Sequence, residues 1–86
     1  MERESQYTIS SVKTALKVLK LFDSAHKSMT LTENTERADM RKGTMVRVLT
    51  TQEEEGFVRY DEISKRYSLG MSIYVLSSNA DRKSVV

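Results

Sequence analysis

With 86 residues, the chain fits one small domain that buries a modest hydrophobic core and leaves no room for a catalytic domain beside it. It contains no cysteine, which excludes disulfides, thiolate metal sites and zinc fingers. Its start is polar and mixed in charge, and no apolar run approaches the roughly 20 residues that cross a bilayer, so we expect a soluble cytoplasmic protein that is not secreted.

The net charge of +2 is unevenly distributed along the chain. Residues 1–50 hold nine Lys or Arg against six Asp or Glu, whereas residues 51–86 hold five against six. A basic first part suits a polyanionic partner such as nucleic acid, but solvated lysine faces give many small domains the same balance. Charge alone therefore leaves both interpretations open.

The first segments in chain order are an arm and a helix. Residues 1–8 lack periodicity, which indicates a flexible arm. A helix is expected over residues 11–24, because apolar residues recur there at helical spacing: Val12, Ala15, Leu16, Leu19 and Phe22. The other side of this helix carries a row of lysines that forms either a solvated face or a phosphate clamp: Lys13, Lys17 and Lys20.

A short helix, a turn and a longer helix follow. Residues 28–31 are expected to be extended, and Thr32 is a suitable N-cap for a brief helix that ends near Ala38. Residues 39–41 then form a turn, and a second helix is expected over residues 42–55. Two helices joined by such a tight turn are typical of a helix-turn-helix.

The helix over residues 42–55 has two different sides. At 100° per residue, one side gathers Met45, Val48, Leu49 and Gln52, and the other gathers Gly43, Val46, Arg47, Thr50 and Glu54. The second side suits either plain solvent or the major groove of DNA.

The chemistry of that second side is the kind that reads a groove. Arg47 can fork onto guanine or a phosphate, and Thr44 and Thr50 can hydrogen-bond to phosphates or base edges. Val46 could touch a thymine methyl. Lys42 and the first backbone amides lie where the helix dipole favours an anion, and Gly43 lets a phosphate approach closely; each is a candidate DNA contact.

A hairpin and a final helix complete the chain. Gly56 follows the long helix at a position that usually needs a positive φ. Strands are expected over residues 57–60 and 66–69, with a turn over 61–65 that places Lys65 and Arg66 near the tip. Residues 71–80 suggest a last helix, followed by an unanchored tail over 81–86.

This order of elements predicts a mainly α fold with a small β-hairpin wing, which is a winged helix-turn-helix. The domain itself is expected over residues 9–70. A basic hairpin tip can reach the minor groove or its flanking phosphates.

Polar residues occupy positions that the helical pattern places in the core. Asn34 and Thr35 fall on the inward side of the short helix, and Gln52 on the inward side of the long one. A buried amide without a partner costs about 1–3 kcal/mol. The two amides could hydrogen-bond to each other across the helix-turn-helix, face a subunit interface, or weaken the domain.

Nothing in the sequence favours catalysis, a metal or a cofactor. The single histidine, His26, lies in a polar loop with no acid at a defined spacing, and is expected to be a solvated residue. The acidic run over residues 53–55 resembles a carboxylate cluster, but neighbouring side chains point apart on a helix. The three glycines are isolated, so there is no phosphate-binding loop.

Four segments of the chain resemble the N-terminal DNA-binding domain of the IclR family of bacterial transcription regulators. They are SVKTALKVLKLF, LTENTERADM, RKGTMVRVLTTQEEEGFV and RYSLG, in this order. The pattern R-x-L-x-x-x-E-E-x-G-F-V followed by R-Y-x-L-G is fairly specific, because winged helices of the marker-resistance and arsenic-repressor types share the topology but lack it. The resemblance covers roughly residues 11–76. Val46 departs from the family, which often has an aromatic residue or histidine there.

The resemblance implies a homodimeric repressor or activator that binds double-stranded DNA. In such proteins a larger C-terminal domain senses a small molecule, and residues 71–86 would be the start of the linker helix and a tail. We therefore expect the chain to be a shortened form or the ordered portion of a longer protein. The expected DNA-contacting residues are Arg41, Lys42, Gly43, Thr44, Val46, Arg47 and Thr50 in the helix-turn-helix, with Lys65 and Arg66 in the wing.

The alternative function is a winged-helix module that binds a protein partner through the same face. Such a face should be apolar, whereas the residues here include an arginine and two threonines.

Overall fold

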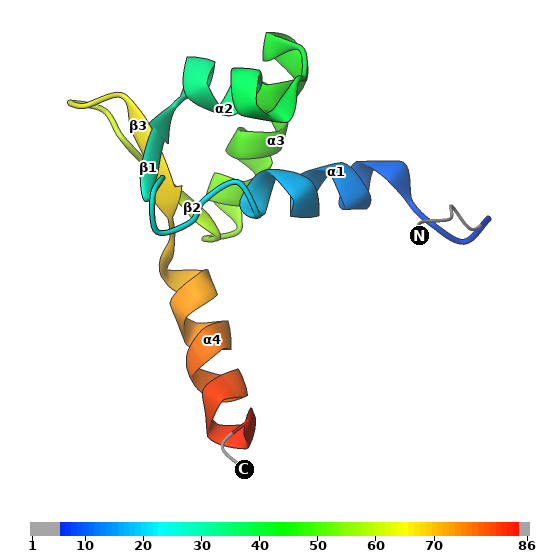
Figure 1. Cartoon of the computed structure of the whole chain (residues 1–86), viewed down its shortest axis with the longest axis vertical. Coiled ribbons are helices and arrows are strands. Elements are labelled where there is room, and N and C mark those ends of the chain that lie inside the picture. The colour runs from blue at the N-terminus through cyan, green and yellow to red at the C-terminus, as the bar shows by residue number, and fades with distance from the viewer. Residues whose placement is uncertain (1–5, 85–86) are drawn as a thin grey trace.

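The computed structural model describes residues 6–84, which form four helices and a three-stranded sheet (Figure 1). Helices α1 and α4 extend away from the body in different directions. Within residues 6–84, no helix is both long and apolar enough to span a membrane. The elements in chain order are α1 (Ser10–Leu19), β1 (Ser28–Thr30), α2 (Leu31–Ala38), α3 (Lys42–Glu54), β2 (Val58–Asp61), β3 (Arg66–Leu69) and α4 (Met71–Ser84).

The first helix is shorter than the apolar spacing predicts. Helix α1 ends at Leu19 rather than near residue 24, because the next amides bond three residues back: Leu21 N donates to Val18 O and Phe22 N to Leu19 O. These tight turns take the chain out of the helix while Phe22 stays buried. The expected arm over residues 1–8 lies largely outside the described residues.

Helix α2 begins two residues earlier than predicted, because its N-cap is Thr30 rather than Thr32. The Thr30 hydroxyl accepts from Glu33 N at 3.1 Å, and the Glu33 carboxylate accepts from Thr30 N at 2.9 Å. This reciprocal pair is a capping box. The helix ends at Asp39, which takes the left-handed conformation with φ 55° and ψ 49° and begins the expected turn.

The hairpin of the wing, β2 and β3, belongs to a three-stranded antiparallel sheet with strand order β1-β3-β2. The predicted hairpin is present, although β2 begins at Val58, one residue later than expected. The extended piece before α2 is strand β1, which pairs with β3. Its last residue, Thr30, pairs with Arg66. Sequence periodicity did not predict this pairing, because three residues are too few to show alternation.

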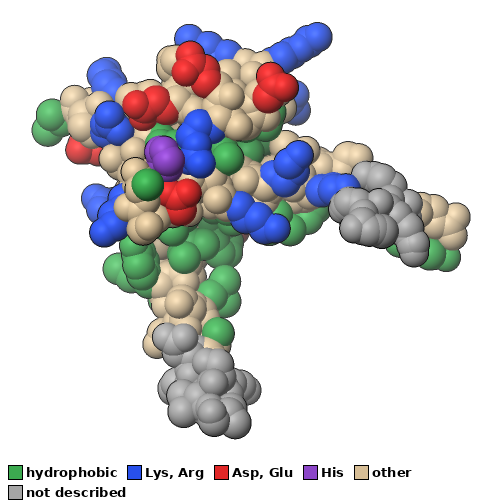
Figure 2. Space-filling view, viewed as in Figure 1, with side chains coloured by type: hydrophobic (Ala, Val, Ile, Leu, Met, Phe, Trp, Pro, Cys, Tyr) green, Lys and Arg blue, Asp and Glu red, His purple; other side chains and the backbone are tan. Residues whose placement is uncertain are grey.

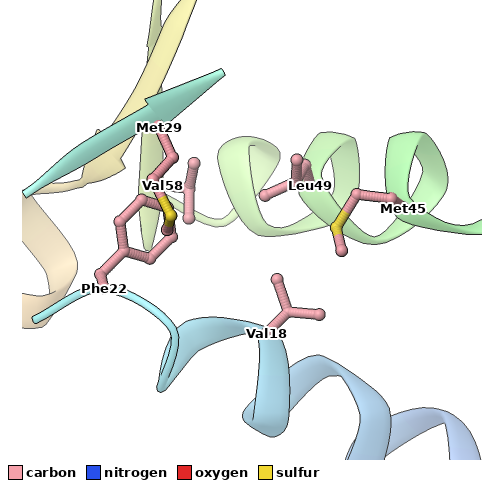
Figure 3. Close-up of a cluster of buried hydrophobic side chains, with 6 residues drawn as sticks. All are labelled: Val18, Phe22, Met29, Met45, Leu49 and Val58. Atoms are coloured by element: carbon pink, nitrogen blue, oxygen red, sulfur yellow. The ribbon is translucent and has the colours of Figure 1, made fainter. Parts of the chain in front are cut away.

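Six buried apolar side chains form the core between α1, α3 and the sheet (Figure 3). Met45 and Leu49 of α3 face Val18 of α1 on one side, while Val58 and Met29 contribute from β2 and β1. Phe22 closes the cluster from the loop after α1. Half-buried residues surround this cluster, and they include Leu31, Ala38, Val48 and Leu69.

The two polar residues in the core do not meet each other. Asn34 is 0% exposed and donates its Nδ2 to Thr30 O at 3.0 Å, within its own helix. Gln52 is 6% exposed and donates its Nε2 to Ala15 O of α1 at 2.7 Å. The remaining oxygens, Asn34 Oδ1 and Gln52 Oε1, are buried with no hydrogen-bond partner. The hypothesis of a hydrogen bond between the two amides is therefore wrong.

The chain leaving α3 and the chain entering α4 touch through their backbones. Gly56 has the expected positive φ, at 82°. A Cβ at Gly70 would lie 2.4 Å from Gly56 O, so no other residue fits there without a shift. Ser72 adds two bonds, from its N to Gly56 O at 3.0 Å and from its Oγ to Glu55 O at 3.1 Å. Helix α4 then continues to Ser84, beyond the expected end near residue 80.

We predict that replacing Gln52 with leucine raises the melting temperature. The volume changes little, the unpaired Oε1 is removed, and Ala15 O can still accept from the helical N–H of Leu19. An unpaired buried polar group costs about 1–3 kcal/mol, against about 0.5–1.5 kcal/mol for the lost hydrogen bond. The expected net gain is about 1 kcal/mol, which circular-dichroism melts would record as about 4–8 °C.

Two further variants make this melt decisive. Gln52→Glu places a carboxylate at the same buried site and should lower the melting temperature. Asn34→Leu adds volume at a site with no exposed surface, so overpacking should offset its gain. A Gln52→Leu protein that melts below the unaltered chain would mean that the bond to Ala15 outweighs the unpaired oxygen.

Candidate nucleic-acid interface

Helix α3 is a single rod with one hidden and one open side, as the sequence predicts. Met45, Leu49 and Gln52 are buried on the side that faces α1 and the sheet. The guanidinium of Arg47 makes no hydrogen bond or ion pair with the residues that the structure describes, and Val46 is 38% exposed. The side chains left open to solvent on the other side come from Thr44, Val46, Arg47, Thr50 and Glu54.

The N-terminus of α3 is open, in contrast with that of α2. Arg41 occupies the N-cap position and its side chain makes no cap hydrogen bond. The first amides of the helix, from Lys42, Gly43 and Thr44, therefore have no side-chain cap and point out of the helix end. All three residues are exposed, and so is Arg41. Cationic side chains and free amides together suit an anion at this end.

Gly43 is not required by the fold. A Cβ built at this position meets nothing within 4 Å, and its φ lies in the ordinary helical range. The absence of a side chain leaves open space beside the first amides of α3. That space would let a phosphate come close to the backbone.

The turn of the wing is organised by Asp61. Its carboxylate accepts from Ile63 N at 3.1 Å and from Ser64 Oγ at 3.0 Å, while its carbonyl accepts from Lys65 N at 2.7 Å. The bond from Ile63 N, followed by that from Ser64, lowers the pKa of Asp61 below its usual value. Lys65 takes a positive φ of 63° and is exposed, as expected at the tip.

An apolar side chain lies at the same tip. Ile63 is 93% exposed, more than any other large hydrophobic residue among those described. Periodicity does not mark this position, and the signal in the sequence is an isoleucine inside an otherwise polar turn.

Arg66 directly follows the turn, near the tip as expected, but its side chain points back toward the body. It is the first residue of β3 and is partly buried at the end of the ladder next to the turn. Its Nη1 donates to Ser28 O at 3.0 Å and lies 3.3 Å from Glu33 Oε1, with which it forms an ion pair. The guanidinium is thus turned toward the protein, whereas the ammonium of Lys65 has no partner among the residues that the structure describes.

His26 has an acidic partner, contrary to the expectation. His26 Nδ1 lies 2.9 Å from Asp23 Oδ1, and the same oxygen accepts from the backbone N of Ala25 and of His26. The side-chain hydrogen bond of His26 is the main reason that the pKa of Asp23 is lowered. Both side chains are about half-exposed, so this pair closes the loop between α1 and β1 rather than forming a buried proton relay.

The acidic end of α3 carries three exposed glutamates at positions 53, 54 and 55. No basic residue lies in the last turn to balance them or the helix dipole. Among the side chains that the structure describes, no group of three or more acidic, histidine or cysteine residues is arranged to hold a metal ion. Positive charge is therefore concentrated at the beginning of α3 and negative charge at its end.

Residues 11–62 match the model of the IclR helix-turn-helix domain, and this match covers more than half of the chain. The chain belongs to the IclR family. It is a DNA-binding domain of a transcription regulator, which is not a class of enzyme.

Solved IclR-family structures share this fold. An IclR transcriptional regulator from Alicyclobacillus acidocaldarius is 45% identical, with a TM-score of 0.81 over 86% of this chain and 30% of that one. An IclR-family regulator from Rhodococcus sp. is 27% identical, with a TM-score of 0.76 over 93% of this chain and 32% of that one. This chain thus spans about a third of their length. A comparison with curated proteins finds no significant match.

We predict that Gly43→Ala separates the stability of this IclR-family domain from its DNA binding. The added methyl meets nothing in the free protein, and alanine favours a helix over glycine by about 1 kcal/mol, so the melting temperature should not fall. Against DNA the methyl should obstruct the approach of a phosphate. We expect affinity to drop about tenfold, equivalent to about 1.4 kcal/mol, in a fluorescence-anisotropy titration.

Thr51→Ala is the matched control, because Thr51 is exposed on the same helix, lies outside the expected contact set and bonds only its own helix through Arg47 O. Its affinity for DNA should stay unchanged. Equal affinities for Gly43→Ala and the unaltered protein would show that no phosphate approaches this helix end.

Proposed function

We propose that the domain binds double-stranded DNA in a sequence-specific manner, with α3 in the major groove and the wing on the flanking backbone or minor groove. The observation that carries this proposal is the fixed orientation of α3. Burial of Met45 and Leu49 holds Arg47 outward without a partner among the described residues. An α-helix with such a polar side has the width that the major groove admits.

The expected contact residues at the start and on the exposed side of α3 make different kinds of contact. Arg47 forks onto a guanine edge or a phosphate, and Val46 contacts a thymine methyl. Thr44 and Thr50 hydrogen-bond to phosphates or bases, while Arg41, Lys42 and the amide beside Gly43 hold a phosphate at the helix end. The glutamates at the other end of α3 would repel the backbone, so contact is concentrated in the first half of the helix.

The wing supplies contacts outside the major groove. Lys65 neutralises a phosphate, and Ile63 lies beside it at the tip, where an apolar side chain can touch the sugars or the floor of the minor groove. These contacts position the domain on the duplex.

A homodimer is the expected functional unit, because a two-fold protein reads two half-sites. Exposed apolar side chains supply a surface for it: Figure 2 shows them gathered where α4 leaves the body and along the edge of α1. The residues of this surface are Ile9, just before α1, Val12 and Leu16 of α1, and Met71, Tyr74, Val75 and Leu76 of α4.

A small-molecule effector would act through a C-terminal domain that these 86 residues do not contain. The protein would act in the cytoplasm, where bacterial DNA lies.

We predict that Arg47→Ala and Lys65→Ala weaken binding in different ways. Loss of a bidentate base contact should cost about 1–3 kcal/mol and reduce discrimination between the selected duplex and random DNA. Loss of a phosphate contact should weaken binding to all duplexes and lower the slope of log K against log salt by about 1. Anisotropy titrations with both duplexes at several salt concentrations measure these effects.

The same titrations test the alternative of a protein-binding module. A complete lack of salt-sensitive binding to either duplex would contradict DNA binding and favour that alternative. If Arg47→Ala loses affinity equally for both duplexes, and discrimination between them is unchanged, Arg47 contacts a phosphate rather than a base.

A further inference from the structure

The contacts of Arg66 point to a role that differs from DNA contact. We infer that Arg66 and Glu33 form a brace that positions the wing on the helix-turn-helix, and that Lys65 reaches DNA only when this brace is intact. This inference rests on the proposed function and adds to it a positioning pair that acts on the same interface.

One carboxylate oxygen joins the two elements. Glu33 Oε1 accepts from Thr30 N at 2.9 Å, as part of the cap of α2, and forms the ion pair with Arg66 Nη1 at 3.3 Å. The same Nη1 donates to Ser28 O at 3.0 Å, and Ser28 Oγ lies 3.5 Å away. The beginning of α2 and the first residue of β3, next to the tip of the wing, are therefore held by a single charge-assisted network.

The position of this network in the sheet gives it influence over the tip. Arg66 pairs with Thr30 on one side and with Asp61 on the other, and both pairings are the last in their ladders. Beyond them, residues 62–65 have no strand partner. The direction in which the tip leaves the body is thus fixed at Arg66, where β3 begins and, opposite it, β1 ends and α2 begins.

The brace and a direct DNA contact predict opposite results for the same substitution. Glu33→Gln removes a negative charge and releases the guanidinium. Simple electrostatics therefore predicts tighter DNA binding, and so does a direct contact by Arg66. The brace predicts weaker binding, because the wing loses its fixed direction. Glutamine can keep the capping box, so α2 should stay folded.

The test uses the 86-residue chain and a duplex that the unaltered chain selects from a random-sequence pool. We expect Glu33→Gln to bind about fivefold more weakly, a change of about 1 kcal/mol. The control is Glu36→Gln, which removes the same charge from an exposed site on the same helix with no contact to Arg66. It should bind equally or slightly more tightly, and melts of both variants should lie within a few degrees of the unaltered chain.

A second measurement distinguishes the brace from a general weakening of the fold. Lys65→Ala should reduce the salt slope by about 1 in the unaltered and Glu36→Gln backgrounds, and by much less in Glu33→Gln, where the wing no longer delivers the lysine. Arg66→Gln should behave like Glu33→Gln, and the two changes together should cost little more than either one.

Several outcomes would overturn the inference while leaving the proposed function intact. They are Glu33→Gln binding as tightly as the unaltered chain or more tightly, Arg66→Gln weakening binding when Glu33→Gln does not, and full additivity with Lys65→Ala. Failure of the unaltered chain to select any duplex would instead overturn the proposed function, and the inference with it.

Discussion

The packing of one side of α3 is the constraint on which the rest of this structure depends. Met45 and Leu49 are fully buried against Val18 and the sheet, and a helix buried on one side must present the other. Thr44, Val46, Arg47 and Thr50 owe their outward direction to this apolar contact. The orientation of the candidate interface therefore depends on a core of only six buried side chains, so a change in any one of them affects it.

The polar interactions are distributed so that they fix the surroundings of α3 and leave its beginning free. Helix α2 has its capping box, the wing turn has Asp61, and the loop after α1 has Asp23 with His26. Helix α3 starts without a side-chain cap, as α1 also does. Satisfied hydrogen bonds thus hold the scaffold, while the unsatisfied donors lie where a ligand can use them.

The sequence predicted best the features that a single periodic pattern determines. Thirteen residues of α3 repeat their apolar side often enough to define both its span and its faces, and Gly56 marks its end by the conformation it adopts. Strand β1 is too short for such a pattern, and its partner lies far along the chain. The cap at Thr30 competed with an equally suitable hydroxyl at Thr32, and only the backbone decides between them.

Side-chain partners distant in sequence were beyond prediction for the same reason. The position of Arg66 next to a turn in the sequence suggests an exposed cation. The carbonyl of Ser28 and the carboxylate of Glu33 come within reach of it only after the sheet is formed. Gln52 of α3 likewise donates to the carbonyl of Ala15 in α1, a partner distant in sequence. These residues show that a polar side chain at an interface helix or wing can serve the fold instead of the ligand.

The contact between Gly56 and Gly70 makes α4 a lever. Two backbones meet there with no side chain between them, so the joint has nothing soft to absorb a rotation. Ser72 also ties the first turn of α4 to the two carbonyls that follow α3. A rotation of the outer part of α4 would therefore be transmitted to the end of α3 through these backbone contacts and not through the hydrophobic core.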